Sequence, residues 1–475
     1  MNNSQSDKKN CEKSRNILVI SELAKRFVSK YSSFFKVYRR DNTRTAINYF
    51  KGLIVCEKGK ANMERMEEEV PESEYRAYQH FISNSKWDHR GLMQSLAYDA
   101  SELFVKNKTL KGFPTGYIVD ESASLKKGDK SVAVTRQYAG IVGKVENCQV
   151  GVYSSLVNDT RATIINAKLF LPKSWTEDKE RCRKAGIPED AMQFKTKPEL
   201  ALDMIDEDIL NGVQFDWIGG DGLYGHNYEL TNGLDYRNLF YVLDVHKDEL
   251  VYLEKPEIKV PDKKSGRGRP PHVPQPVGDP IRLDKYKRTL NENDWEEVKV
   301  RKTAKGWLKL KVHKVEVWVW NRENNMLKRR TLIISQTIEK KHRVKYSFSN
   351  GLLDDYSRKE YAYFQAQRYW VERTFDDSKN ELGMSDYQVR KWTGWYHHTV
   401  LVIMAGLYLT QEKIANEKEL PLMSTADARV LMIAYLFGTE EQQQMRIKQM
   451  VTRHKKRKKD IDRRYRYQEI EEQLL

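Results

Sequence analysis

Cysteine is scarce in this chain of 475 residues, and its four cysteines stand far apart. They form no Cys-x-x-Cys pair, so neither a disulfide framework nor a zinc module is expected. The four are Cys11, Cys56, Cys148 and Cys182. Thiols scattered in this way suit the reducing conditions of a cytoplasm.

Uninterrupted apolar stretches are short throughout the sequence. None approaches the roughly 18 residues that a membrane-spanning helix needs. The first residues, MNNSQSDKKNCEKSRN, contain no apolar segment of the kind found in secretory signal peptides. The sequence therefore predicts a cytoplasmic protein without a membrane partner.

Positive charge, by contrast, is in excess. Lys and Arg number 83 against 67 Asp and Glu, which gives a net charge of +16 and a pI near 9.3. A composition of 32% charged and 39% hydrophobic residues is that of a globular protein. This surplus favours a polyanionic partner, usually nucleic acid, although a basic protein without a specific DNA partner is the alternative.

Composition and periodicity divide the chain into six regions. A polar tail expected to be disordered (1–16) precedes a helical N-terminal domain (17–111). The first part of an α/β core (112–246) is followed by a basic β insertion (247–357). Further core helices (358–415) and a basic helical C-terminal region (416–475) complete the sequence. In the core, short strands are followed by strand–helix alternation, which predicts helices packed against a mixed sheet. For the N-terminal domain, a helical bundle of unknown purpose and a domain that binds DNA ends remain equally open.

Two basic regions stand out in the second half of the chain. The insertion contains alternating lysine-rich segments such as WLKLKVHKVEVWVWNR, which predict antiparallel strands with one basic, solvated face. Near the end, residues 446–466 hold eleven Lys or Arg in twenty-one positions, with Tyr465 among them. This run is expected to bind the phosphate backbone without reading bases, and therefore with a steep dependence on salt.

Two aspartates follow predicted strands. Asp120 ends the apolar run Gly-Tyr-Ile-Val, where burying a carboxylate is costly unless it binds something. Asp221 has glycines on both sides, which allow a sharp turn and the close approach of a ligand. A turn or cap aspartate at the first position, and a solvated strand-end aspartate at the second, are the structural alternatives.

Glu372 is the third candidate acid, and its neighbours can be placed on a helix. Five polar residues fall within roughly 60° of one another on the helical wheel: Gln365, Arg368, Glu372, Asp376 and Lys379. An adjoining apolar stripe would dock the helix on the sheet: Phe364, Val371, Phe375 and Leu382. A carboxylate between Arg and Lys suits metal and phosphate binding, whereas a surface helix with ion pairs one turn apart is the alternative.

The order of these acids, and the sequence around each of them, resembles the DDE transposases of bacterial insertion sequences, in particular their 701 family. From about Tyr75 onward, three stretches carry the likeness: residues 126–152, 169–190 and 194–205. The family's second-acid motif D-A-x-Y-G is represented by Asp221-Gly-Leu-Tyr-Gly. A related group has the signature Y-(2)-R-(3)-E-(6)-K, which Arg368, Glu372 and Lys379 match, with Gln365 at the tyrosine position.

The resemblance implies an RNase H-like catalytic core that is interrupted by the β insertion. Asp120 on the first strand, Asp221 after the fourth and Glu372 on a following helix would be catalytic and would bind two Mg²⁺ ions, with Mn²⁺ as a substitute. Cleavage at transposon ends would free 3′-hydroxyls that attack target DNA. Arg368 and Lys379 would hold phosphates. The partners would be double-stranded DNA of both kinds and at least one further copy of the chain, at the nucleoid of a prokaryotic cell.

Two further motifs are open to more than one interpretation. Gly266-Arg-Gly-Arg-Pro-Pro resembles an AT-hook, in which Arg267 and Arg269 would enter a narrow minor groove. A basic loop without sequence preference is the alternative. His397 and His398 suggest metal ligation, but a packed or solvated histidine pair is favoured.

Three functions remain in view at this stage. An active transposase is the first, an RNase H-like nuclease without strand transfer the second, and a domesticated, non-catalytic DNA-binding protein the third. Retention of all three acids together with Arg368 and Lys379 argues against the third, because a decayed site would tolerate their loss.

Overall fold

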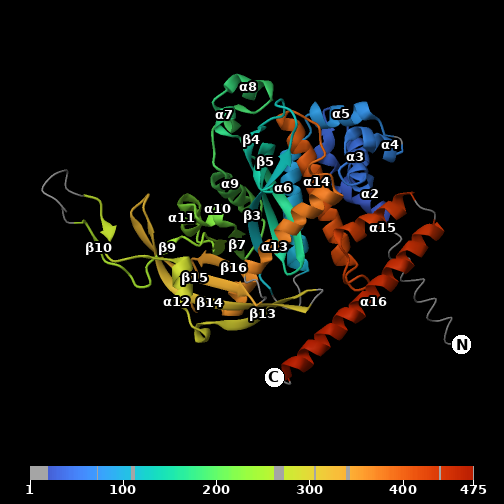
Figure 1. Ribbon diagram of the computed structural model, residues 1–475. Helices are drawn as coiled ribbons and strands as arrows, with labels where there is room; N and C mark the ends of the chain where they lie inside the picture. Colours follow the sequence, from blue (N-terminus) through green and yellow to red (C-terminus); the bar gives the residue numbers. More distant parts are fainter. Residues whose placement is uncertain are drawn as a thin grey trace. The chain divides into compact units, whose positions relative to one another are not determined.

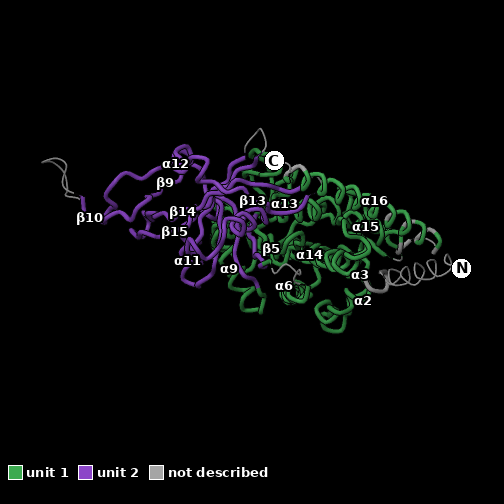
Figure 2. Tube along the Cα trace, turned by 90° about the horizontal axis from the view of Figure 1, so that it is seen from below, with its two compact units in different colours: residues 1–113, 121–214, 370–475 green, residues 114–120, 215–369 purple. Residues whose placement is uncertain are grey.

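The computed structural model describes residues 20–71, 73–107, 113–261, 272–303, 306–338, 343–437 and 440–473. The tail at residues 1–16 and the arginines of the AT-hook-like motif, Arg267 and Arg269, lie outside these ranges. Figure 2 shows two compact units, residues 1–113, 121–214 and 370–475 (unit 1) and residues 114–120 and 215–369 (unit 2). Among the described helices, none combines the length and the apolar character that crossing a bilayer requires.

Ten strands form one mixed sheet (Figure 1). Its order is β13-β14-β15-β16-β8-β7-β3-β5-β4, and β6 also pairs with β5. The strands are β3 Gly116–Leu125, β4 Thr135–Ala139, β5 Lys144–Asn158, β6 Arg161–Leu169, β7 Trp217–Gly220, β8 Tyr241–Asp244, β13 Glu296–Thr303, β14 Gly306–Asn321, β15 Met326–Thr337 and β16 Val344–Ser349. With helices at both ends of the chain, this sheet confirms the predicted mixed α/β class.

The parallel part of the sheet consists of β3, β7 and β8. All four residues of β7, Trp-Ile-Gly-Gly, are buried, as expected for a short parallel strand that is covered on both faces. The glycines are needed here because a Cβ on Gly219 would lie 2.8 Å from the Trp217 ring. The sequence of β7 is thus fitted to a tightly enclosed strand.

The helices of unit 1 include one long, mostly buried apolar helix, α14. They are α2 Ile20–Lys30, α3 Thr43–Val55, α4 Met63–Glu69, α5 Tyr75–Ser83, α6 His89–Lys106, α7 Lys173–Thr176, α8 Lys179–Lys184, α9 Lys197–Leu210, α14 Trp392–Ala415, α15 Thr425–Phe437 and α16 Glu440–Gln473, with short strands β1 Lys36–Val37 and β2 Arg40–Asp41. Nearly all of α14 is buried, and it contacts α3, α5, α6 and α15. A helix that is apolar on every side needs such a covering, which the helices of the N-terminal region provide.

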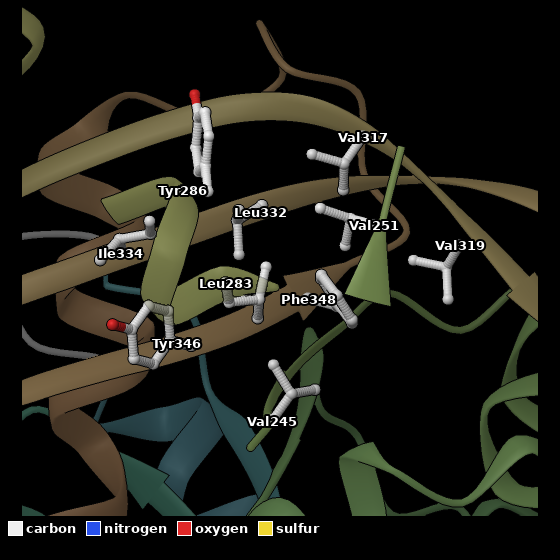
Figure 3. Packing of buried hydrophobic residues seen from close by; sticks show 10 residues of the cluster. All are labelled: Val245, Val251, Leu283, Tyr286, Val317, Val319, Leu332, Ile334, Tyr346 and Phe348. Atoms are coloured by element: carbon white, nitrogen blue, oxygen red, sulfur yellow. The ribbon is translucent and has the colours of Figure 1, made fainter. Parts of the chain in front are cut away.

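Unit 2 contains the predicted β insertion. Its remaining elements are α10 Gly222–Gly225, α11 Tyr228–Tyr236, β9 Leu250–Val251, β10 Ile258–Lys259, β11 Gln275–Pro276, β12 Ile281–Arg282 and α12 Leu283–Thr289. Because β16 pairs with β8, the long antiparallel strands of the insertion continue the sheet. Figure 3 shows their apolar core, in which Leu283 and Tyr286 of α12 meet Val317, Leu332 and Phe348 from the strands.

The exposed face of the insertion differs from the basic, solvated face predicted from sequence. Lys311 on β14 pairs with Glu292 at 2.5 Å, and Lys309 lies 3.8 Å from Glu297. The lysines of β14 are half-buried along their length. Acidic residues from neighbouring segments therefore offset much of the charge that the strand sequence suggests.

Candidate active site

Asp120 and Asp221 lie on neighbouring parallel strands of unit 2, Asp120 in the middle of β3 and Asp221 directly after the last residue of β7. β3 and β7 pair with Tyr117 opposite Ile218 and Ile118 opposite Gly219. Continuing this register by two residues sets Asp120 opposite Asp221, whose backbone is still extended. Because paired residues of parallel strands point to the same face, the two carboxylates are neighbours. Both side chains are partly exposed.

Asp221 also caps the short helix α10. Its Oδ1 accepts a hydrogen bond of 2.9 Å from the backbone N–H of Leu223. This capping role, which the sequence patterns suggested for Asp120 and not for Asp221, coexists with the place of Asp221 beside Asp120. α10 then returns close to β8, because a Cβ on Gly225 would lie only 2.0 Å from the carbonyl oxygen of Asp244. Only glycine permits this approach.

The sequence patterns did not indicate a third acid, Asp244, which is the last residue of β8. β7 and β8 pair with Gly219 opposite Val242 and Gly220 opposite Leu243, so the next position sets Asp221 opposite Asp244. The available signal was the segment FYVLD, an apolar run ending in aspartate like the run before Asp120. Asp244 accepts hydrogen bonds from the Ser347 hydroxyl at 2.7 Å and from the Arg368 guanidinium at 3.2 Å.

Helix α13, Arg358–Glu381, carries the residues of the predicted signature. Its predicted apolar stripe is confirmed, since four side chains are buried: Phe364, Val371, Phe375 and Leu382. Arg368 belongs to unit 2, whereas Glu372 and Lys379 belong to unit 1. Glu372 is exposed and lies one helical turn after Arg368. The structure therefore brings Asp120 and Asp221 together and places Glu372 in the other unit.

Lys379 is tied to the strand that carries Asp120. Its Nζ donates a hydrogen bond of 3.1 Å to the carbonyl oxygen of Ala123, within unit 1. Burial lowers the pKa of this ammonium, and nearby Asp376 acts in the opposite direction. The amine is thus held in place before any ligand arrives.

Gln365, at the tyrosine position of the signature, has a structural role. The side chain is 3% exposed and donates a hydrogen bond of 2.7 Å to the Ser347 hydroxyl. The amide therefore anchors α13 to β16 from inside the protein.

The donor set of the aspartate pair suits hard cations. Carboxylate oxygens are the ligands that Mg²⁺ and Mn²⁺ prefer, and Asp120 and Asp221 supply them from two adjacent strands. Within the described ranges, no cluster of three or more His, Cys, Asp or Glu side chains is arranged to hold a metal ion. The aspartate pair thus fits part of a metal site.

The two adjacent histidines are packed, as favoured from sequence. His398 contacts the Tyr49 hydroxyl through Nδ1 at 2.9 Å and the Gly383 carbonyl through Nε2 at 3.2 Å. His397 stacks on Trp87 with ring centroids 3.9 Å apart. Burial lowers the pKa of each to about 3, so both rings are neutral. Their contacts are those of core residues.

A sequence profile of the DDE superfamily endonucleases matches residues 32–306, more than half of the chain. The chain belongs to this superfamily. The matched stretch includes Asp120 and Asp221 and ends before α13, so Glu372 lies beyond it.

More particularly, the chain is 23% identical over 388 residues to the probable transposase for insertion sequence element IS701 of Microchaete diplosiphon. The alignment covers 81% of this chain and 86% of that protein, which confirms the resemblance to the 701 family. Among solved structures, the chain is similar to that in a piggyBac transposase synaptic complex with hairpin DNA. The alignment covers 91% of this chain and 79% of the piggyBac chain. Its sequence identity is 11% and its TM-score 0.40, a similarity too low to support an argument.

Proposed function

We propose that the protein is a transposase that cleaves DNA at the ends of its element and joins the freed 3′-hydroxyls to target DNA. The observation that carries the proposal is the parallel register of β3 and β7, which sets Asp120 beside Asp221. Family membership supports the nuclease chemistry. The parallel strands β3, β7 and β8, with β5 beyond β3, would be the centre of an RNase H-like core.

In this proposal, Asp120 and Asp221 hold divalent cations, and Glu372 completes the ligand set from α13. When bound, two such ions supply an activated nucleophile and stabilise the leaving oxygen of an in-line displacement. The residues of the chain fix the geometry, because each acid is attached to a regular element. Arg368 and Lys379 hold phosphates of the DNA, Lys379 from an amine already hydrogen-bonded to the backbone at Ala123.

Two bond exchanges at phosphorus make up the proposed reaction. In the first, water attacks, the bond to the 3′ oxygen at the end of the element breaks, and a 3′-hydroxyl is released. In the second, that hydroxyl loses its proton, forms a bond to a target phosphorus, and displaces a 3′ oxygen of the target strand. Pairing two ends in this way requires at least two copies of the chain.

An assay with labelled duplexes from the two ends of the element tests this function. In Mg²⁺ the full-length protein should release free 3′ ends and then produce joined products with a plasmid target. Free 3′ ends without joined products would instead identify a nuclease without strand transfer. Binding without cleavage in Mg²⁺ or Mn²⁺ would identify a non-catalytic DNA-binding protein.

The long helix α16 is the proposed surface for the DNA backbone. Ile447, His454 and Tyr465 are buried, whereas the five consecutive cations at residues 455–459 are exposed. His454 lies 3.5 Å from Asp427, which ties α16 to α15 within unit 1. The buried stripe therefore leaves the basic run open to a polyanion.

Replacing Lys455 and Lys456 together by Gln is expected to flatten the salt dependence of DNA binding. Each lost phosphate contact should reduce the slope of log K against log salt by about 0.9, or roughly 1.8 for the pair. Arg183→Gln with Lys184→Gln is the matched control, because these exposed cations already pair with Glu189 and Glu180. Fluorescence anisotropy at several salt concentrations measures both slopes. An equal change in the two variants would contradict a specific role for α16.

A further inference from the structure

A chain of hydrogen bonds connects α13 to the edge of the sheet within unit 2. Gln365 Nε2 donates to Ser347 Oγ at 2.7 Å, and Ser347 Oγ donates to Asp244 Oδ1 at 2.7 Å. Arg368 Nη1 donates to Asp244 Oδ2 at 3.2 Å. The series of hydrogen bonds thus begins at Gln365 on α13, passes through Ser347 on β16 and Asp244 on β8, and returns to α13 at Arg368.

This arrangement fixes the helix at two points. Gln365 and Arg368 are three residues apart and so lie on the same side of α13, one turn from each other. Anchoring both to the same short network defines the rotation of the helix and its position along its axis. Ser347 is fully buried and Asp244 only 18% exposed, so water competes weakly for these bonds.

Both oxygens of Asp244 are engaged. Oδ1 accepts from Ser347, whereas Oδ2 faces Arg368 at 3.2 Å and Lys345 at 3.9 Å. A carboxylate held on one side by a buried hydroxyl has little freedom to rotate. Its other oxygen is therefore a fixed point to which the long Arg368 side chain is directed.

We propose that Asp244 is a positioning residue, which with Ser347 and Gln365 holds the Arg368 guanidinium ready to bind a DNA phosphate at the sheet edge. This inference rests on the proposed function. The register sets Asp244 beside Asp221, so the guanidinium is anchored one strand away from the aspartate pair.

The energetic advantage is preorganisation. Arginine binds phosphate through a planar fork of N–H donors, but ordering a long side chain on binding costs conformational entropy. Asp244 orders the side chain in advance, and it also balances the positive charge when no DNA is present. The amide at residue 365 takes part in this function, which accounts for glutamine at the tyrosine position of the signature.

The test is a double-mutant cycle on the full-length protein with end DNA in Mg²⁺. Asp244→Asn keeps the shape of the side chain and removes its charge, and it should slow single-turnover cleavage by roughly 10–100-fold. In an Arg368→Ala background the same substitution should have no further effect, because the group it positions is already absent. The dissociation constant for end DNA, measured in the same four proteins, gives a second readout of the cycle.

Glu381→Gln is the matched control. Glu381 lies at the end of α13 and pairs with Arg429 at 3.4 Å, with side chains 20% and 14% exposed. The Asp244–Arg368 pair has a similar length and similar exposures of 18% and 21%. The control variant should cleave within about two-fold of wild type if loss of a comparable ion pair has no general effect.

The outcomes separate the two proposals. Two outcomes would show that the positioning role is wrong, provided that wild type cleaves. In the first, Asp244→Asn cleaves as fast as wild type. In the second, Asp244→Asn slows cleavage by the same factor whether residue 368 is arginine or alanine. If wild type does not cleave at all, the proposed function is wrong. Should Asp244→Asn fail to fold, Ser347→Ala provides the test, since it leaves the Asp244 carboxylate in place and removes the hydroxyl that links Gln365 to it. Ser347→Ala should slow cleavage when Arg368 is present and have no effect in the Arg368→Ala background. A Ser347→Ala protein that cleaves at the wild-type rate would overturn the proposal.

Discussion

Replacing Asp221 by Asn is expected to abolish Mg²⁺-dependent cleavage of end DNA while leaving DNA binding within about two-fold of wild type. Asparagine keeps the volume of the side chain but provides no negative charge for a divalent cation. Loss of one such ligand should cost several kcal/mol in the transition state, about 10³-fold in rate. Asp120→Asn and Glu372→Gln should behave in the same way.

Glu121→Gln is the control for these three variants. It follows Asp120 on β3, points to the opposite face of the strand, and pairs with Lys197 at 2.9 Å. Its cleavage rate should remain near that of wild type. Rates are measured by gel electrophoresis of labelled ends, and binding by anisotropy without a divalent ion. Normal cleavage by any of the three acid variants would remove that residue from the proposed site.

A single methyl group on Gly225 is expected to unfold the region around the strand ends. The Cβ of Gly225→Ala would lie 2.0 Å from the carbonyl oxygen of Asp244, and a backbone atom cannot move aside as a side chain can. α10 would have to separate from β8, which disturbs both Asp221 and Asp244. The free energy of unfolding should fall by about 3 kcal/mol, and cleavage should be lost with it.

Gly140→Ala tests whether any added methyl group has this effect. No atom lies within 4 Å of the position its Cβ would occupy, so stability should remain near that of wild type. Urea unfolding followed by circular dichroism measures both variants. A Gly225→Ala protein with wild-type stability would show that α10 does not pack on β8 as described.

Local sequence patterns predicted the elements around the site well, but not their pairing. The glycine-flanked Asp221 indicated a strand end, and β7 does end at Gly220. The apolar run before Asp120 indicated a second strand end, which is wrong, because β3 continues past Asp120 to Leu125. Their adjacency depends on a parallel register between segments about 100 residues apart in the chain. No local pattern contains that information. The run FYVLD marks Asp244 as the end of a strand, but its place beside Asp221 likewise depends on the register of β7 and β8.

The polar contacts of individual side chains also could not be predicted from the sequence. The lysines of β14 alternate as in a basic surface, but acids such as Glu292 come from separate segments to pair with them. From the sequence, Gln365 was noted only because it stands at the tyrosine position of the Y-(2)-R-(3)-E-(6)-K signature. Its buried bond to Ser347 depends on how α13 rests on β16, which helical periodicity cannot specify.

The burial of α14 has a consequence for the synthesis of the protein. The helices at residues 20–106 have α14 as a major part of their common core, but α14 begins only at Trp392. At about 5–20 residues per second, a ribosome needs roughly 15–60 s to translate the intervening segment. During that interval the apolar faces of the early helices have no α14 to pack against, so chaperones have time to bind them. A product truncated before Trp392 would lack the helix on which α3, α5 and α6 pack, so its apolar helix faces would stay uncovered.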